Sequence, residues 1–239
     1  MKYQIFTSSL IAASAFMLFS PSARAELYSD AVTSTPGLVG YWQLGETSGN
    51  YADSSSQGNT GVPGAHVIQG VPGPRPSDGF LGFDANHDAA GFNSAANGTP
   101  DYPGYDDSQG YIDVPNPGSG VLDPRTGNYS VSLWFQVPSD SKIYTIASKG
   151  SGAHDGWLVE RLDPNEGIYA NELNVNMADP GGTGHGPVAY VAPPTWQNLV
   201  FVLHRNGNAT PGYSDSGISM YVNGVFIAED STTAFDPAV

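Results

Sequence analysis

Polar and apolar residues alternate along several short stretches of this sequence, which is the pattern of β-strands that bury one face. Residues 129–137 place Val, Leu, Phe and Val on one face and Ser, Ser, Trp and Gln on the other. A strand is also predicted at residues 167–177, where 170–177 repeat the pattern with Leu, Val and Met on one face. Residues 199–203 are an unbroken apolar run rich in Val and Phe, which predicts a strand buried on both faces.

A tight hairpin is predicted at Asn223 and Gly224. These two residues stand between the apolar runs 218–222 and 225–228 with nothing else intervening. A two-residue type I′ turn needs positive φ at both positions, and Asn-Gly tolerates that conformation best. The two runs are therefore expected to pair as antiparallel strands.

The rest of the chain carries weaker strand signals. Further strands are predicted at residues 38–44, 80–84, 110–115, 143–149, 157–162 and 187–191. The segment 26–36 is rich in Ser and Thr and is expected to be a flexible lead-in, and 86–109 is expected to be a long loop. Prolines in 62–79 predict extended chain at a sheet edge or outside the sheet.

The number and type of these elements indicate the fold class. No stretch combines helical periodicity with proper caps, and about ten to twelve short strands separated by turn signals are typical of a sandwich or barrel. We therefore predict an all-β fold, an antiparallel two-sheet β-sandwich of the jelly-roll type. A single domain over residues 26–239 is expected, because no linker divides it and no repeat has a fixed period.

The first 25 residues have the three-part pattern of a secretory signal peptide. Lys2 gives a basic start, residues 5–19 are mostly apolar, and Ala23-Arg24-Ala25 fits the small-x-small cleavage rule. The apolar run is short for a membrane span, so cleavage is favoured over anchoring or over a buried N-terminal helix. We therefore expect a secreted protein, extracellular or in the cell envelope.

The composition of the chain argues against some classes of binding partner. The chain has 23 acidic and 8 basic residues, a formal charge of −15, and no cysteine. Such an acidic surface repels nucleic acid and anionic membranes, and no second apolar run is long enough to predict a membrane span. Carboxylates and carbonyls are the ligands that Ca²⁺ prefers, so the composition is compatible with a divalent cation.

An ordered set of motifs resembles a known family. The pieces are Leu-Val-Gly-Tyr-Trp-Gln-Leu-Gly-Glu-Thr-Ser-Gly at 38–49, Ala-Asp-Ser-Ser-Ser-Gln-Gly-Asn-Thr-Gly at 52–61, Leu-Gly-Phe-Asp at 81–84, Tyr-Ile-Asp-Val-Pro at 111–115, Tyr-Ser-Val-Ser-Leu-Trp-Phe at 129–135, Trp-Gln-Asn-Leu-Val-Phe-Val at 196–202 and Met-Tyr-Val-Asn-Gly at 220–224. In order and spacing they resemble the bacterial laminin-G-like (LamG-like) jelly rolls of the concanavalin A-like lectin/glucanase superfamily. The resemblance covers nearly all of residues 26–239 and implies a concanavalin A-like sandwich.

The sequence departs from that family pattern in two places. Residues 86–109 separate pieces that are usually close together. Family members also continue past the Asn-Gly hairpin with a further strand and a closing segment, which this sequence lacks before Val239. We expect either that the sequence is a fragment of a longer protein or that a sheet position is left open, where unpaired backbone groups invite association.

The resemblance also implies a structural Ca²⁺ in the loop 53–61. Family members often hold the ion with a carboxylate and carbonyls of this loop and a carboxylate near the C-terminus. Asp53 and Asn59 are the matching positions, and oxygen-rich loops suit a cation with six to eight ligands. The alternative is an ordinary Asx-turn loop without an ion.

Carbohydrate is the ligand class that the strand pattern favours. Glu172, Asn174 and Asn176 share one strand face, and Trp134 lies on the polar face of its own strand. An aromatic platform with a few placed polar groups is the usual sugar-binding combination. The alternative is that Trp134 is a core residue and that the polar row faces only water.

No catalytic group can be identified from the sequence. Glycosidases need two carboxyl groups across the bond, and Glu160, Asp163 and Glu166 have the wrong spacing and an interrupting proline. No Gly-x-Ser-x-Gly elbow and no zinc-spaced histidine pair occurs. We therefore predict a non-catalytic recognition module for carbohydrate or a cell-surface protein. The alternatives are a polysaccharide lyase or hydrolase on the same fold and a structural spacer.

Overall fold

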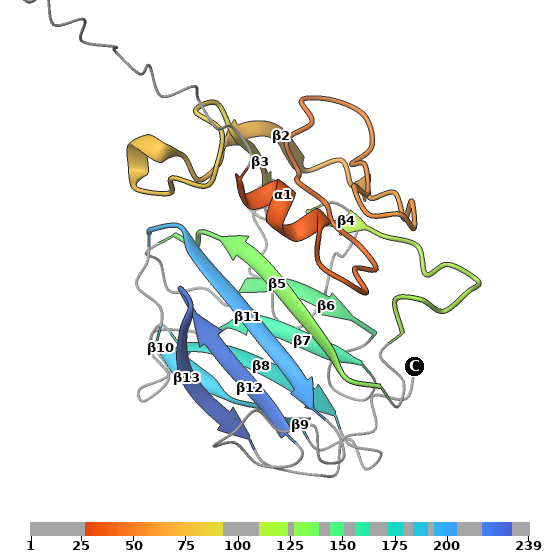
Figure 1. Cartoon of the computed structure of the whole chain (residues 1–239), viewed down its shortest axis with the longest axis vertical. Coiled ribbons are helices and arrows are strands. Elements are labelled where there is room, and N and C mark those ends of the chain that lie inside the picture. The colour runs from red at the N-terminus through yellow and green to blue at the C-terminus, as the bar shows by residue number, and fades with distance from the viewer. Residues whose placement is uncertain are drawn as a thin grey trace, which may run out of the picture.

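The computed structural model describes residues 27–92, 110–123, 127–138, 144–150, 156–162, 172–178, 184–190, 194–204 and 217–230. Within these ranges two antiparallel sheets pack face to face, and smaller elements from the N-terminal part lie above them (Figure 1). The predicted all-β class and the antiparallel sandwich are confirmed. No helix in the described ranges is long and apolar enough to cross a membrane.

The front sheet of Figure 1 contains the hairpin and the long apolar run. Its strands, in spatial order, are β13 (Val225–Asp230), β12 (Gly217–Val222), β11 (Gln197–His204) and β5 (Tyr129–Phe135). All neighbours in this sheet are antiparallel. Strand β11 therefore lies between β12 and β5, which are far apart in sequence.

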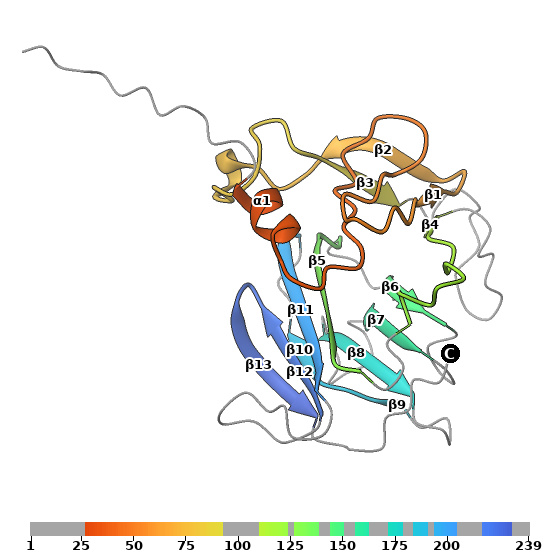
Figure 2. The same cartoon turned by 45° about the vertical axis from the view of Figure 1, so that its right-hand side comes forward.

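The rear sheet lies behind it. Its strands, in spatial order, are β10 (Val188–Tyr190), β8 (Glu172–Ala178), β7 (Trp157–Arg161) and β6 (Tyr144–Lys149), and the short β9 (Gly184–His185) also pairs with β8. Figure 2 shows the two sheets side by side, with β8 facing β11. The core of the sandwich lies between them.

That core consists of the inward residues of both sheets, as the alternation predicts. The fully buried apolar residues of the core are Val159, Leu173, Val175, Met177, Leu199, Phe201, Leu203, Ile218 and Met220. One prediction is wrong in part. Strand β11 is not buried on both faces, because Val200 and Val202 face outward and stay half-exposed while their neighbours are buried.

The predicted hairpin is confirmed. Asn223 and Gly224 connect β12 to β13 with φ of 51° and 76°. The turn is also tied to β11, because the Asn198 backbone N–H donates to Asn223 Oδ1 at 2.9 Å and the Asn223 N–H donates to the Asn198 carbonyl at 2.8 Å. This reciprocal pair holds the turn against the end of the front sheet.

The elements above the sandwich form what we call the N-terminal unit. It comprises α1 (Leu27–Thr33), β1 (Val62–Pro63), β2 (Val67–Pro72), η1 (Pro76–Asp78), β3 (Asp88–Phe92) and β4 (Ile112–Asp113). Strand β1 pairs with β4 and β2 pairs with β3, each as a separate two-stranded sheet. The prolines of 62–79 thus lie outside the two main sheets, as expected.

Several expectations for this unit are wrong. Residues 27–33 are helical rather than a flexible lead-in, because Tyr28 stacks on Phe83 with ring centroids 4.8 Å apart and its N–H donates to the Gly82 carbonyl. Residues 80–84 form turns rather than a strand. Part of the expected loop 86–109 is strand β3, and residues 93–109 lie outside the described ranges, as do residues 1–26.

The expected strand at 38–44 is also absent. This segment forms one isolated bridge, between Trp42 and Asp53, instead of a ladder. Leu44 has a φ of 60°, in the left-handed region, which breaks the alternation of faces. The Tyr41 N–H donates to the Asp53 carboxylate rather than to a neighbouring strand.

Candidate functional site

Trp134 is the centre of an aromatic cluster that joins the N-terminal unit to the front sheet. The residue lies on the outer face of β5, away from the core. The rings of Phe83, Phe80 and Tyr28 approach it edge-on, with centroid distances of 5.0, 5.2 and 6.0 Å. Such edge-to-face pairs are favourable beyond the area they bury. The cluster therefore docks α1 and the 80–84 turns onto the sheet.

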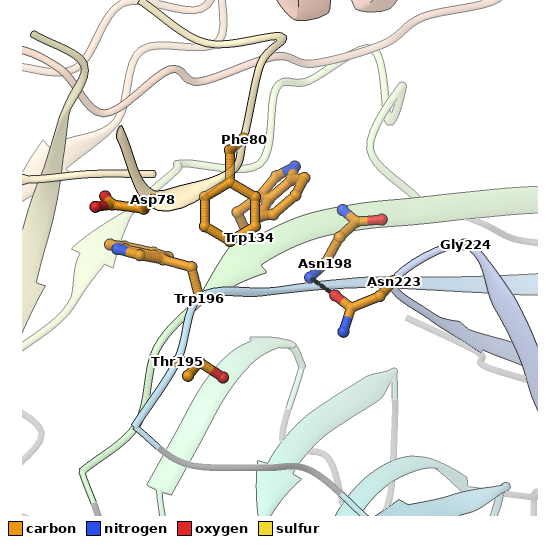
Figure 3. Close-up of a pocket in the computed structure, with 8 residues that line it drawn as sticks. All are labelled: Asp78, Phe80, Trp134, Thr195, Trp196, Asn198, Asn223 and Gly224. Carbon is orange, nitrogen blue, oxygen red and sulfur yellow. Dashed lines mark hydrogen bonds between the residues drawn. The ribbon is translucent and has the colours of Figure 1, made fainter. Parts of the chain in front are cut away.

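An open pocket of about 590 Å³ lies beside this cluster, and we call it the junction pocket (Figure 3). Its lining comes from η1 and the following turn, from the ends of β5 and β11, and from the β12–β13 hairpin. The lining residues are Asp78, Phe80, Trp134, Thr195, Trp196, Asn198, Asn223 and Gly224.

Three aromatic rings give the pocket its apolar walls. Asn198 is directly opposite Trp134 in the β5–β11 register, so the two side chains share the outer face of the sheet. Trp196 precedes Asn198 by two positions and lines the same pocket. In Figure 3 the Phe80 ring is drawn in front of Trp134, which it meets edge-on, and Trp196 is drawn below Asp78.

The polar groups of the pocket are held in place by the sheet. The Asn198 amide Nδ2 donates to Ser132 Oγ at 3.3 Å and to the Leu133 carbonyl at 3.2 Å. Asn223 Oδ1 accepts from the Asn198 backbone N–H. No described residue bonds to Asn198 Oδ1 or Asn223 Nδ2. One acceptor and one donor are therefore free for a ligand.

The predicted row Glu172, Asn174 and Asn176 does share one face of β8, as the alternation requires. That face is the outer side of the rear sheet, because Leu173, Val175 and Met177 fill the core. Trp134 is on the outer side of the front sheet, so the structure does not bring it together with the row. The two sets of predicted ligand-binding residues lie on opposite faces of the sandwich.

The outer face of the rear sheet also carries aromatic and polar side chains. Tyr190 is paired with Glu172 and is 67% exposed. Asn174 Nδ2 donates to Glu160 Oε1 at 3.5 Å. Burial raises the pKa of the Glu160 carboxyl above its usual value, and the Asn174 hydrogen bond offsets part of the rise. Asn176 Oδ1 is buried and has no hydrogen-bond partner among the described residues.

The structure brings Asp53 and Asn59 together, as the loop pattern predicts. Asp53 Oδ1 accepts from the N–H groups of Tyr41 and Ser55, and Oδ2 accepts from that of Asn59, each at 2.8 Å. Burial raises the pKa of Asp53, but these hydrogen bonds outweigh that effect and hold the pKa below its usual value. The Trp42 indole N–H donates to the Asn59 carbonyl, which closes the other side of the loop.

Hydrogen bonds hold this loop together in the structure, because both Asp53 oxygens and the Asn59 carbonyl accept N–H groups. Across the described part of the chain, no three His, Cys, Asp or Glu side chains converge as a metal site. The carboxylate serves the backbone of the loop, and calcium binding stays a prediction of the family resemblance.

One polar pair was not foreseen from the sequence. His204 Nε2 and Ser219 Oγ are 2.6 Å apart on β11 and β12, a contact typical of a base and its nucleophile. Both side chains are buried, at 4% and 0% exposure, so the described structure offers a substrate no path to the hydroxyl. The pair acts as a satisfied internal hydrogen bond, and only the strand register could have revealed it.

Trp196 and Phe80 were also missed as site residues. Trp196 directly precedes β11, two positions before Asn198, so a strand register that placed Asn198 outward would have placed Trp196 beside it. Phe80 and Asp78 carry no such signal. They reach the pocket because the N-terminal unit docks on Trp134, a tertiary contact that no local pattern predicts.

Comparison with known proteins shows the fold and little more. No protein-family model matches the sequence, and no curated protein matches it. The structure is similar to the binding domain of botulinum neurotoxin DC in complex with rat synaptotagmin II, with a TM-score of 0.51 and 13% identity over 83% of this chain and 40% of that chain. The botulinum neurotoxin type G receptor-binding domain gives a TM-score of 0.44 and 15% identity, over 83% of this chain and 41% of that one. The chain thus spans about 40% of the solved structures it matches, and it shares a β-rich fold with the first of them.

Proposed function

We propose that this protein is an exported, non-catalytic binding module that recognises carbohydrate in the junction pocket. The observation that carries the proposal is the convergence of Phe80, Trp134 and Trp196 around an open pocket of about 590 Å³. Ligand pockets usually measure about 300–1,000 Å³ and combine apolar walls with few placed polar groups. The junction pocket has that size and composition.

The chemistry of the lining suits a sugar ring. The C–H face of a pyranose packs on a flat aromatic ring, and its hydroxyls need donors and acceptors at the ring edge. Trp196 offers the flat surface, while Asn198 Oδ1 and Asn223 Nδ2 offer one acceptor and one donor. Because the sheet already fixes both amides, binding immobilises few side chains.

Two further lines support a binding role. The motifs at 38–49 and 129–135 resemble laminin-G-like jelly rolls of a superfamily that includes lectins. The botulinum neurotoxin DC binding domain, with which this chain shares its fold, is solved in complex with rat synaptotagmin II. That complex makes a cell-surface protein the second candidate partner. The signal-peptide pattern of residues 1–25 supports export.

A glycan array with matched variants tests the proposal. We expect Trp196→Ala to weaken binding by about tenfold or more, because truncation removes roughly 2 kcal/mol of ring contact. Tyr190→Ala removes an exposed aromatic from the rear face and is the matched control. Trp196→Phe keeps a smaller platform and is expected to lose less than the alanine variant. A melting curve for each variant shows that it is folded.

The outcomes separate the alternatives. Loss of binding in Tyr190→Ala but not in Trp196→Ala would move the site to the rear face and contradict the junction pocket. Binding to no glycan, with capture of a purified cell-surface protein instead, would favour the second candidate. Release of reducing ends or unsaturated uronates from a polysaccharide would show an enzyme.

A further inference from the structure

Negative charge is not balanced by positive charge among the described lining residues of the junction pocket. Asp78 is the one charged side chain among its described lining residues, and no Lys, Arg or His lines it. Arg75, three residues before Asp78, donates to Asp88 Oδ1 at 3.0 Å and to the His87 carbonyl. Its charge is therefore already paired, and the pocket presents a carboxylate without a counter-charge.

The aromatic walls of the pocket also favour a cationic ligand. The faces of Trp and Phe rings carry partial negative charge and attract cations within about 6 Å of the ring centroid. Asp78 and Trp196 both line the pocket, and Figure 3 draws them on the same side of it. A cation on the Trp196 ring face is therefore on the same side of the pocket as the Asp78 carboxylate. The formal charge of the whole chain, −15, attracts cationic ligands and repels anionic ones at longer range.

We propose that the junction pocket selects ligands that carry an organic ammonium group, and that among carbohydrates it prefers amino sugars whose amine is free. This inference rests on the proposed function and names its ligand class. The ring of the sugar packs on the aromatic walls, and its protonated amine lies between Trp196 and Asp78. Uronates and sulfated sugars are disfavoured, because their charge meets Asp78 with no basic side chain to pair with.

Two oligosaccharides that differ only in the amine test the inference. Glucosamine tetramer and N-acetylglucosamine tetramer share their backbone, but only the first is cationic at mildly acidic pH. We expect titration calorimetry to show tighter binding of the glucosamine tetramer. Asp78→Asn is expected to weaken that binding by about twofold to fivefold, from the loss of one exposed ion pair. It is expected to leave the N-acetylglucosamine tetramer unchanged.

Asp113→Asn is the matched control. Asp113 is exposed on β4, outside the pocket lining, so the variant makes the same charge change elsewhere. Asp78 is exposed too, and its side chain bonds only to Ser77 Oγ among the described residues, so its replacement leaves the fold intact. As a measurement that needs no variant, added salt is expected to weaken glucosamine binding to the natural protein and not N-acetylglucosamine binding.

Choline separates failure of this inference from failure of the proposed function. Equal binding of the two tetramers, with no effect of Asp78→Asn, would overturn the ammonium inference and leave carbohydrate binding standing. If choline binds in an Asp78-dependent manner and neither tetramer binds, the result would support recognition of an ammonium group and contradict the preference for amino sugars. If the protein binds neither tetramer nor choline, the ammonium inference is wrong, and the glycan array decides the proposed function separately.

Discussion

The hydrogen bonds around Asp53 predict that this one carboxylate contributes strongly to stability. Its two oxygens accept three backbone N–H groups at 2.8 Å, from Tyr41, Ser55 and Asn59. A hydrogen bond to a charged group contributes about 1.5–3 kcal/mol, but the loop is partly open to water, so we take about 1 kcal/mol for each. Asp53→Ala should therefore lower the free energy of unfolding by about 3 kcal/mol. For a domain of this size that corresponds to a melting temperature about 6–12 °C lower.

The loss should also depend on pH. The folded-state pKa of Asp53 lies below its usual value, so its contribution is complete above the unfolded-state pKa of about 4 and disappears as the pH falls through the folded-state value. Urea unfolding followed by tryptophan fluorescence, at neutral pH and at a pH below that range, measures both effects. Asp113→Asn, an exposed acid on β4, is the control. A loss under about 1 kcal/mol, or an equal loss at both pH values, would refute the reasoning.

Four other predictions follow from the same structure. If Asp53 bonds the backbone rather than a cation, the melting temperature is the same in EDTA and in millimolar Ca²⁺. A melting temperature that is higher in Ca²⁺, by an amount that Asp53→Ala abolishes, would instead favour the calcium prediction. Trp134→Ala should destabilise the protein by about 3 kcal/mol in urea unfolding, because it removes the ring on which three aromatic residues dock. Gly224→Ala should lower the free energy of unfolding by about 1 kcal/mol, since its φ is 76°, and an unchanged midpoint would contradict that. Because the folded-state pKa of Glu160 is raised, stability falls as pH rises through its ordinary value toward the folded one; Glu160→Gln should remove this decline, which unfolding at acidic and neutral pH would show.

The sandwich could be predicted from the sequence because its strands obey a local rule. In β5 and β8 every second residue enters the core, so the period of two is visible in the residue types themselves. The hairpin could be predicted because Asn223 and Gly224 adopt a backbone conformation that few residues accept. Strand β11 shows the limit: an apolar run does not reveal whether its second face is covered.

The N-terminal unit could not be predicted because its order comes from distant contacts. The segment 38–44 bonds to the side chain of Asp53 instead of a strand, and α1 depends on Tyr28 packing against Phe83. Most of the candidate site could not be predicted for the same reason. The strand pattern predicts Trp134 as a site residue, and Trp134 does line the pocket, but Asp78 and Phe80 reach it only through the docked unit.

The junction pocket belongs to two parts of the chain at once. One wall comes from η1 and Phe80, and the other from β5, β11 and the Asn223 turn. A ligand that touches both walls binds only the docked form, so thermodynamic linkage makes occupancy and docking favour each other by the same free energy. At one hundred times its Kd such a ligand adds about 2.7 kcal/mol to the docked form. A ligand that bridges the two walls would in this way stabilise the contact between the N-terminal unit and the front sheet.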